Sequence, residues 1–181
     1  QGMALMAAQA PTLDLFDAVA RLSPEARKSA ILVALDQIQD PHNLGAIART
    51  AACLGVVGLI IPERRSAPVT QAVIQASAGA IEKIPVHHIG NLAQTLARLK
   101  KAGFWVYGAD MEGKPAWSVV INAPMVLVIG SEGYGMRPLV KEHCDEVLAI
   151  PQSEGGVASL NASCAASILL YEAVRQLKQG S

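Results

Sequence analysis

Aromatic residues are scarce in this chain, and neither sign of charge is in excess. Only 4% of the 181 residues are Phe, Trp or Tyr, which excludes an extended surface of aromatic side chains that stack on successive bases. Lys and Arg together number 15, as do Asp and Glu, so the formal net charge is zero. A protein that holds nucleic acid by bulk charge alone would be basic. Any contact with an anionic polymer therefore requires a local basic patch or a further domain.

Cysteines and long hydrophobic runs are also lacking. Cys53, Cys144 and Cys164 lie far apart and form no CxxC pair, which argues against a zinc site or a disulfide framework and predicts a cytoplasmic location. The four histidines lack the spacing of metal ligands, so no metal is expected. No apolar run approaches the ~20 residues that span a bilayer. Met3–Ala10 has no basic region, so no signal peptide is predicted.

Aliphatic residues are abundant, and they fall into two alternating kinds of segment. Hydrophobic residues make up 51% of the chain, enough for a sizeable core. From residue 30 onward, short continuous apolar runs typical of buried strands alternate with longer segments typical of helices. This alternation predicts an α/β fold, a mostly parallel sheet with helices on both faces. The predicted strands are Ile31–Leu35, Val56–Ile61, Phe104–Tyr107, Met125–Ile129 and Val147–Ile150, and the predicted helices are Leu44–Leu54, Val69–Ala80, Leu92–Ala102, Arg137–His143 and Leu160–Leu177.

The pattern predicts one domain preceded by a short extension. Residues 1–29 form the extension, with one amphipathic helix around Asp14–Leu22 that Ser23-Pro24 ends. Gln1 and Gly2, which precede Met3, are typical of residues left by cloning. Residues 30–178 form the domain, and 179–181 form a tail.

The loop after the first predicted strand carries two candidate site residues. Ligands of open α/β sheets bind beyond the carboxyl ends of the strands. This loop reads DPHNLGA and leads into a helix. Asn43 is placed either to cap that helix or to serve a site, and both interpretations stay open. Arg49 points nearly opposite to the apolar stripe of the helix, on a face with the small residues Ala46 and Cys53. An arginine on such a face suggests a site wall or a contact between subunits.

The loop after Met125–Ile129 is rich in glycine. It reads GSEGYGMRP, and its three glycines let the backbone approach a ligand closely. The glycine order is GxxGxG rather than GxGxxG, so the dinucleotide fingerprint is not met and a nicotinamide oxidoreductase is disfavoured. Glu132 would repel a phosphate, but it suits a neutral or cationic ligand or a hydroxyl. The alternative interpretation is a turn before a helix that starts at Pro138.

The segment Gly108–Pro115, GADMEGKP, nearly matches a phosphate-binding loop. It fails at its last position, because Pro115 has no hydroxyl for magnesium. Asp110 and Glu112 would also oppose phosphates. Binding of a nucleoside triphosphate is therefore disfavoured.

Polar residues gather at the start of the last predicted helix. Ser159, Asn161 and Ser163 lie where the unpaired N–H groups of a helix start point. A helix cap needs only one such residue, so three suggest that a polar ligand binds at the helix start. The alternative is that these residues do no more than cap the helix.

Basic residues occur in a few small groups. The pairs Arg64-Arg65 and Lys100-Lys101 are interpreted as solvated charges. Together with Arg49, Arg137 and Lys141 they can also form a local strip that binds anions, as a neutral protein would need for any contact with nucleic acid.

Taken together, three of these segments resemble the SpoU/TrmH family of RNA ribose 2′-O-methyltransferases, in the SPOUT superfamily. The resemblance covers about residues 31–178, and three motifs in the same order are far more specific than any one of them. Two further stretches, Glu142–Asp145 and Leu170–Gln176, are most similar to the RlmB-type branch, which modifies a guanosine of large-subunit ribosomal RNA. The three motifs are Asp40–Ala46 with Arg49–Ala51, Ile129–Met136, and Ile150-Pro151 followed by Ser159–Ser163.

The resemblance implies a fold, a cofactor and a set of site residues. It implies a SPOUT-type fold with a C-terminal trefoil knot, S-adenosylmethionine (AdoMet) as methyl donor, RNA as substrate, and a homodimer with its site near the subunit interface. The family's catalytic residues fall on Asn43, Arg49, Glu132, Ser159 and Asn161. Its donor-binding positions fall on Ala109, Gly130, Gly133, Ile150 and Leu160.

Other functions stay open beside this one. Many RlmB-like proteins carry an N-terminal RNA-binding domain, for which residues 1–29 are too short. The alternatives are a transfer RNA 2′-O-methyltransferase and a binding module that holds RNA or an adenine nucleotide without catalysis.

Overall fold

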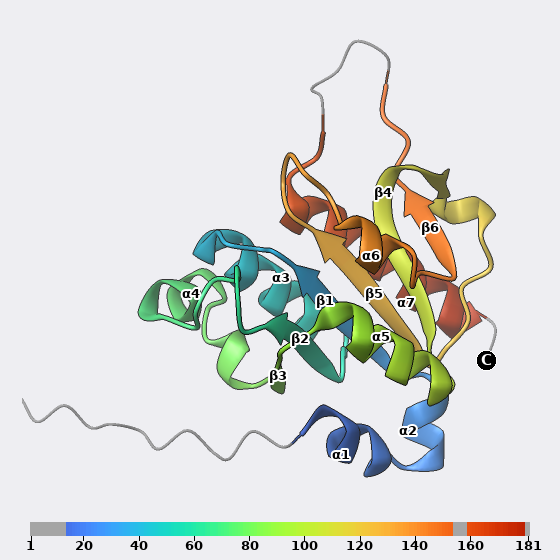
Figure 1. Cartoon of the computed structure of the whole chain (residues 1–181), viewed down its shortest axis with the longest axis horizontal. Helices are drawn as coiled ribbons and strands as arrows, with labels where there is room; N and C mark the ends of the chain where they lie inside the picture. Colours follow the sequence, from blue (N-terminus) through green and yellow to red (C-terminus); the bar gives the residue numbers. More distant parts are fainter. Residues whose placement is uncertain (1–13, 154–158, 180–181) are drawn as a thin grey trace, which may run out of the picture.

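Six parallel strands form the sheet of this protein. The computed structural model describes residues 14–153 and 159–179. The strands lie in the order β3-β2-β1-β5-β4-β6 (Figure 1). The α/β class and the parallel sheet that the alternating segments predict are confirmed. The strands are β1 (Ile31–Asp36), β2 (Gly58–Pro62), β3 (Val86–Ile89), β4 (Trp105–Pro115), β5 (Met125–Gly130) and β6 (Glu146–Ala149).

The sequence predictions miss one strand and the length of another. Strand β3 lies at the sheet edge and reads Val-His-His-Ile, with only His87 buried, so it contains no continuous apolar run. Strand β4 continues to Pro115, beyond its predicted end, and its register against β6 shifts between Ala109 and Lys114. The segment that nearly matches a phosphate-binding loop is therefore the irregular half of a strand.

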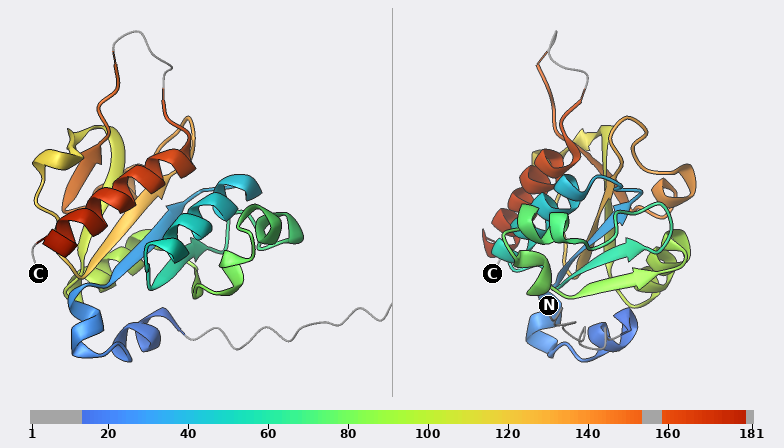
Figure 2. Two further views of the ribbon diagram at one scale, coloured as in Figure 1. Left: turned by 180° about the vertical axis from the view of Figure 1, so that it is seen from behind. Right: turned by 90° about the vertical axis from the view of Figure 1, so that its left-hand side faces the viewer.

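Helices cover both faces of the sheet (Figure 2). Side chains of β1 alternate between two cores: Ile31, Val33 and Leu35 face one, and Leu32 and Ala34 face the other. Because both faces are covered, a strand of six buried residues has no polar position until its last residue. The first core is covered by α3 (Pro41–Cys53), α4 (Gln71–Ala76) and α7 (Ala162–Gln179), and the second by α5 (Leu92–Lys101) and α6 (Pro138–Lys141).

Two helix boundaries differ from the predictions for local reasons. Helix α3 begins at Pro41 because the Asp40 carboxylate accepts a hydrogen bond from the backbone N–H of His42 at 2.9 Å. The capping interpretation of Asn43 is therefore wrong. The helix predicted over Val69–Ala80 is shorter: α4 ends before the left-handed residue Ala78, and a single 3₁₀ turn follows.

The described part of the N-terminal extension packs against α5. It forms two helices, α1 (Leu15–Ala20) and α2 (Pro24–Lys28); the Ser23 side chain caps α2, and Pro24 is its first residue. Leu15 is buried in the second core, and the Arg98 guanidinium lies 3.6 Å from the centroid of the Phe16 ring. The domain boundary at residue 30 stays a prediction, as does the trefoil knot. Residues 3–10 lie outside the described residues.

Two classes of feature are absent from the described residues. None of their helices has the length and hydropathy needed to cross a membrane. No three of their His, Cys, Asp or Glu side chains gather as a metal site would require.

Cys144 differs from the other two cysteines in its surroundings, and this difference is testable. Burial, reinforced by the nearby Asp145, raises the pKa of Cys144 to about 12, whereas Cys53 and Cys164 are exposed. The thiolate is the reactive form. In the native protein at about pH 8 we expect iodoacetamide to alkylate Cys144 about 1000-fold more slowly than an ordinary thiol, since each pKa unit is a factor of ten. Peptide mass spectrometry measures this, urea-unfolded protein is the control, and native labelling at equal rates would contradict it.

Candidate active site

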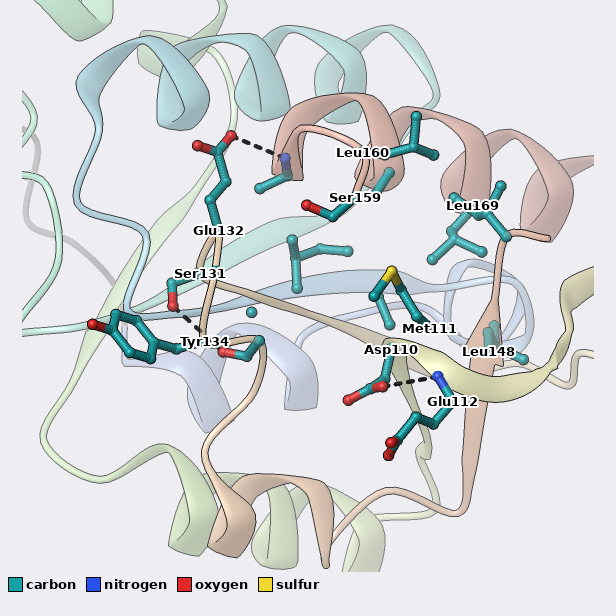
Figure 3. A pocket seen from close by; sticks show the side chains of 18 of the residues that line it. Asp110, Met111, Glu112, Ser131, Glu132, Tyr134, Leu148, Ser159, Leu160 and Leu169 are labelled. Carbon is teal, nitrogen blue, oxygen red and sulfur yellow. Dashed lines mark hydrogen bonds between the residues drawn. The ribbon is translucent and has the colours of Figure 1, made fainter. Parts of the chain in front are cut away.

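A cavity of about 500 Å³ opens at the carboxyl ends of β5 and β6 and beside the irregular half of β4. This volume falls within the ~300–1,000 Å³ typical of small-molecule sites. Four separate segments of the chain line it, and Glu132 and Ser159 project into it (Figure 3). Its lining includes every position that the family resemblance assigns to donor binding: Ala109, Gly130, Gly133, Ile150 and Leu160.

Beside this cavity, three polar side chains from distant segments form one hydrogen-bonded cluster. The Glu132 carboxylate Oε1 accepts bonds from Nδ2 of Asn43 at 3.0 Å, from Nδ2 of Asn161, and from the backbone N–H of Ala162 at 3.2 Å. Nδ2 of Asn161 also lies 2.9 Å from Oδ1 of Asn43. The cluster thus joins the first turn of α3, the loop after β5 and the start of α7. A carboxylate that accepts several N–H bonds holds its donors strongly.

Asn161 serves both the helix and the cluster. Its Oδ1 accepts the backbone N–H of Ser163 at 2.9 Å, as a cap residue does, while its Nδ2 points to Glu132 and Asn43. Asn161 therefore caps α7 and takes part in the polar cluster at the same time, so the cap and the site interpretations of this segment are compatible. Ser159 lines the cavity, whereas the Ser163 hydroxyl turns back to donate to Asn161 at 2.6 Å.

The cavity presents negative charge and apolar surface. Asp110, Glu112 and Glu132 line it, and no Lys or Arg is present among the described lining residues. Aliphatic side chains such as Leu148 and Leu169 form much of the remaining wall (Figure 3). Such walls suit a ligand with an apolar part and a positive charge, and they oppose the phosphates of a dinucleotide.

Asp110 keeps its negative charge despite partial burial. Burial alone would raise the pKa of this carboxyl. The backbone N–H of Glu112, 3.0 Å from Oδ1, and the Lys141 ammonium, 3.0 Å from Oδ2, outweigh burial and hold the pKa below its usual value. Asp110 is therefore ionised at neutral pH, and the Lys141 ammonium partly balances its charge.

The glycine-rich loop is closed tightly over the end of β5. A Cβ on Gly130 would lie 2.2 Å from the carbonyl carbon of Gly135, so no other residue fits there. Ser131 and Gly135 exchange two backbone hydrogen bonds, of 2.9 and 3.1 Å, and Gly133 and Gly135 have positive φ. The loop therefore has one compact shape, which presents Glu132 to the cluster. The helix predicted to start at Pro138 does start there, as α6.

Comparison with known proteins shows the family to which this chain belongs. The sequence profile of the SpoU rRNA Methylase family matches residues 30–171. The chain belongs to the SpoU/TrmH family. It is 44% identical over 180 residues to a putative TrmH family tRNA/rRNA methyltransferase of Staphylococcus haemolyticus, covering 99% of this chain and 72% of the relative. It is 45% identical over 161 residues to the putative TrmH family tRNA/rRNA methyltransferase YacO of Bacillus subtilis, covering 88% and 64%.

Among solved structures, the SpoU methyltransferase AviRb of Streptomyces viridochromogenes in complex with AdoMet superposes with a TM-score of 0.77 at 30% identity. The match covers 85% of this chain and 63% of that one. The present chain thus spans about two thirds of the length of the family members that it resembles. The SPOUT fold is shown by these structures, and AdoMet is the cofactor of the family.

The resemblance to the SpoU/TrmH family implies a site role for Arg49, but within one chain this residue lies away from the cavity. Arg49 lies six residues beyond Asn43 on α3, about 9 Å along the helix axis, and lines neither this cavity nor a second one beside it. Its side chain is exposed and makes no hydrogen bond or ion pair with the described residues. The role that the resemblance implies for Arg49 therefore stays a prediction that needs a second chain.

Sequence reasoning missed the residue that anchors the glycine-rich loop of this SpoU/TrmH chain. Asp36, at the end of β1, is fully buried. Its carboxylate accepts the backbone N–H of Arg137 at 2.7 Å and the guanidinium at 2.8 and 2.7 Å. This pairing ties the far end of the loop to the central strand. The available signal was an aspartate that directly follows an unbroken apolar run, where a buried charge requires a partner.

Proposed function

We propose that this protein transfers a methyl group from AdoMet to the ribose 2′-hydroxyl of an RNA nucleotide. The observation that carries the proposal is the cavity whose described lining has three carboxylates and no Lys or Arg, directly beside the cluster of Asn43, Glu132 and Asn161. Lys141 pairs with Asp110 and Glu112 from outside the lining, so Glu132 is the carboxylate left for a cationic ligand. A cationic small molecule fits the cavity, and hydroxyl groups fit the cluster.

AdoMet fits the residues present. The apolar walls at Leu148, Ile150 and Leu160 suit an adenine ring, and the backbone of the glycine-rich loop is open to close approach. Asp110 and Glu132 offer carboxylates to ribose hydroxyls and to positive charge. When bound, AdoMet supplies an electrophilic methyl group on a sulfonium.

The chain's own residues would align the acceptor hydroxyl. A ribose hydroxyl is a poor nucleophile at neutral pH, so the reaction needs alignment and help in removing the proton. All three described bonds to the Glu132 carboxylate end on Oε1. Oε2 is thus left to accept a hydrogen bond from substrate, while Asn43 and Asn161 fix its direction. Ser159 completes the polar wall.

Arg49 would come from a second subunit. Helices α3 and α7 lie side by side, with Thr50 and Ser167 hydroxyls 3.0 Å apart, and α7 leaves Ile168 and Tyr171 exposed. We propose that two copies pair on this surface, so that the guanidinium of Arg49 reaches the partner's cluster. Since a guanidinium stays protonated at neutral pH, it is a poor base. It would instead grip the neighbouring RNA phosphate and stabilise the developing alkoxide.

The most fitting substrate is a guanosine of large-subunit ribosomal RNA, methylated in the cytoplasm, in line with the RlmB-type resemblance. The relatives' names, which give both tRNA and rRNA, keep a transfer RNA nucleotide as the second candidate.

A direct experiment decides between these substrates and tests the activity. We expect the purified chain to bind AdoMet in calorimetry and not NAD, because phosphates face carboxylates in the cavity. Mapping 2′-O-methyl positions in total RNA from cells with and without the protein should reveal one lost site. AdoMet binding with an identical methylation map would support the non-catalytic binding module instead.

A further inference from the structure

A second cavity lies on the other side of the glycine-rich loop. It measures about 430 Å³ and opens at the carboxyl ends of β1, β2 and β5. Ser131, Glu132 and Tyr134 line both cavities, so this short stretch forms a wall between them. Asn43 also faces the second cavity. A group in the second cavity would therefore meet a group in the first at the polar cluster.

The second cavity has a cation in its wall and the first does not. Arg65 lines the second together with Asp40 and Glu132, whereas the described lining of the first has carboxylates and no Lys or Arg. Arg65 is exposed and makes no hydrogen bond or ion pair with the described residues, unlike Arg137, which is paired with Asp36. A guanidinium whose five N–H groups are all available matches the geometry of a phosphate.

The backbone around the second cavity is held in an uncommon conformation. Gln37 and Arg65 have φ of 64° and 59°, and they are two of the three non-glycine residues with positive φ in the described chain. Side chains make this region unfavourable, and such residues concentrate at ligand sites where the surrounding structure holds them. Both residues line the second cavity, so the strain fixes the direction of a positive and a polar side chain there.

The wall between the cavities includes one aromatic ring, that of Tyr134, which does not pack in the core. Tyr134 is 93% exposed, at the rim of both cavities. In a chain with so few aromatic residues, a ring that packs against nothing in the core is available for a flat ligand. An unpaired base stacks on such a ring irrespective of its sequence.

We propose that the second cavity seats the acceptor nucleotide, with Arg65 on a backbone phosphate and Tyr134 against its base. This inference rests on the proposed methyl transfer and adds the residues that hold the RNA. The ribose would then lie at Glu132, opposite the donor cavity. Because the base must leave its stack to meet Tyr134, the acceptor is a nucleotide in a loop or single strand rather than in a duplex.

The test compares two adjacent arginines in the full chain. Arg64 is also exposed but lines neither cavity, so Arg64→Ala removes the same charge without the contact. Filter binding to an unmodified transcript of large-subunit ribosomal RNA, and to unmodified tRNA, is measured at several salt concentrations. For Arg65→Ala we expect binding of the accepted RNA to weaken about tenfold, with the salt slope reduced by about 0.7, as for one lost phosphate on a single strand. Arg64→Ala should change binding less than twofold, and AdoMet affinity should be unchanged in both.

Tyr134 provides an independent arm. Tyr134→Ala should raise the KM for RNA about tenfold, whereas Tyr134→Phe, which keeps the ring, should stay near wild type. Circular dichroism checks that each variant is folded. Equal effects of Arg65→Ala and Arg64→Ala would overturn this inference while the methyl transfer itself stands. If the wild-type chain methylates neither RNA, the proposed function falls, and the binding comparison still decides whether the cavity holds RNA.

Discussion

Replacing Glu132 by glutamine is expected to lower methyl transfer by about 100-fold or more while the chain stays folded. The glutamine carbonyl oxygen can still accept from Asn43, Asn161 and the Ala162 N–H, but without the charge that makes these bonds strong. A shift of about 1 Å of the RNA hydroxyl relative to the methyl donor lowers the rate by about 100-fold. Single-turnover kinetics with radiolabelled AdoMet measures the loss.

The matched control for this variant is Glu112→Gln. Glu112 lines the same cavity but is exposed and lies outside the polar cluster. We expect its turnover to stay within about threefold of wild type, since an exposed charge is screened by solvent. Equal losses in the two variants would mean that the cavity's overall charge, and not the cluster, governs the rate.

Glu132→Gln also serves to locate Arg49. If the site is shared between subunits, mixing inactive Glu132→Gln and Arg49→Ala chains creates mixed dimers in which one site has both native residues. The mixture should recover about a quarter of the wild-type rate. No recovery, with exchange of subunits shown by mass spectrometry, would place both residues of a site in one chain.

The sheet and the meeting of three motifs follow from local signals in the sequence. Continuous apolar runs mark strands covered on both faces, and parallel strands bring their carboxyl ends to one edge. The segments that contain Asn43, Glu132 and Asn161 therefore meet although they are up to 118 residues apart in sequence. The edge strand β3 escaped prediction because exposure removes the need for apolar residues at every position.

What the sequence could not predict is the surroundings of residues whose contacts come from distant segments of the chain. The position of Arg49 on the face opposite the apolar stripe indicates that it points outward, but no single-chain pattern says what it meets. The cap at Asp40 took the role considered for Asn43, because the helix starts at Pro41. Arg65 is exposed, in line with its interpretation as a solvated charge or as part of an anion-binding strip, but the sequence did not reveal the cavity formed where its loop meets Tyr134.

The buried pair Asp36–Arg137 should have the largest effect on stability. Arg137→Met leaves a fully buried carboxylate without its cation, with only a backbone N–H to hold it. Breaking such a pair costs about 3–5 kcal/mol, and we expect about 3 kcal/mol because the Arg137 side chain is 43% exposed. The melting temperature should fall by about 6–12 °C at this chain length. Lys114→Met, which breaks an exposed pair with Glu146, should cost less than about 1 kcal/mol.

A double-mutant cycle separates the pair from its surroundings. Asp36→Asn with Arg137→Met removes the buried charge together with its partner, so the double variant should be more stable than Arg137→Met alone. Urea unfolding followed by circular dichroism gives the four free energies. Because the same pair anchors the glycine-rich loop, Arg137→Met should also weaken AdoMet binding, whereas Lys114→Met should not. Additive losses across the cycle would show that Asp36 finds its stabilisation elsewhere, and that the loop keeps its shape without the guanidinium.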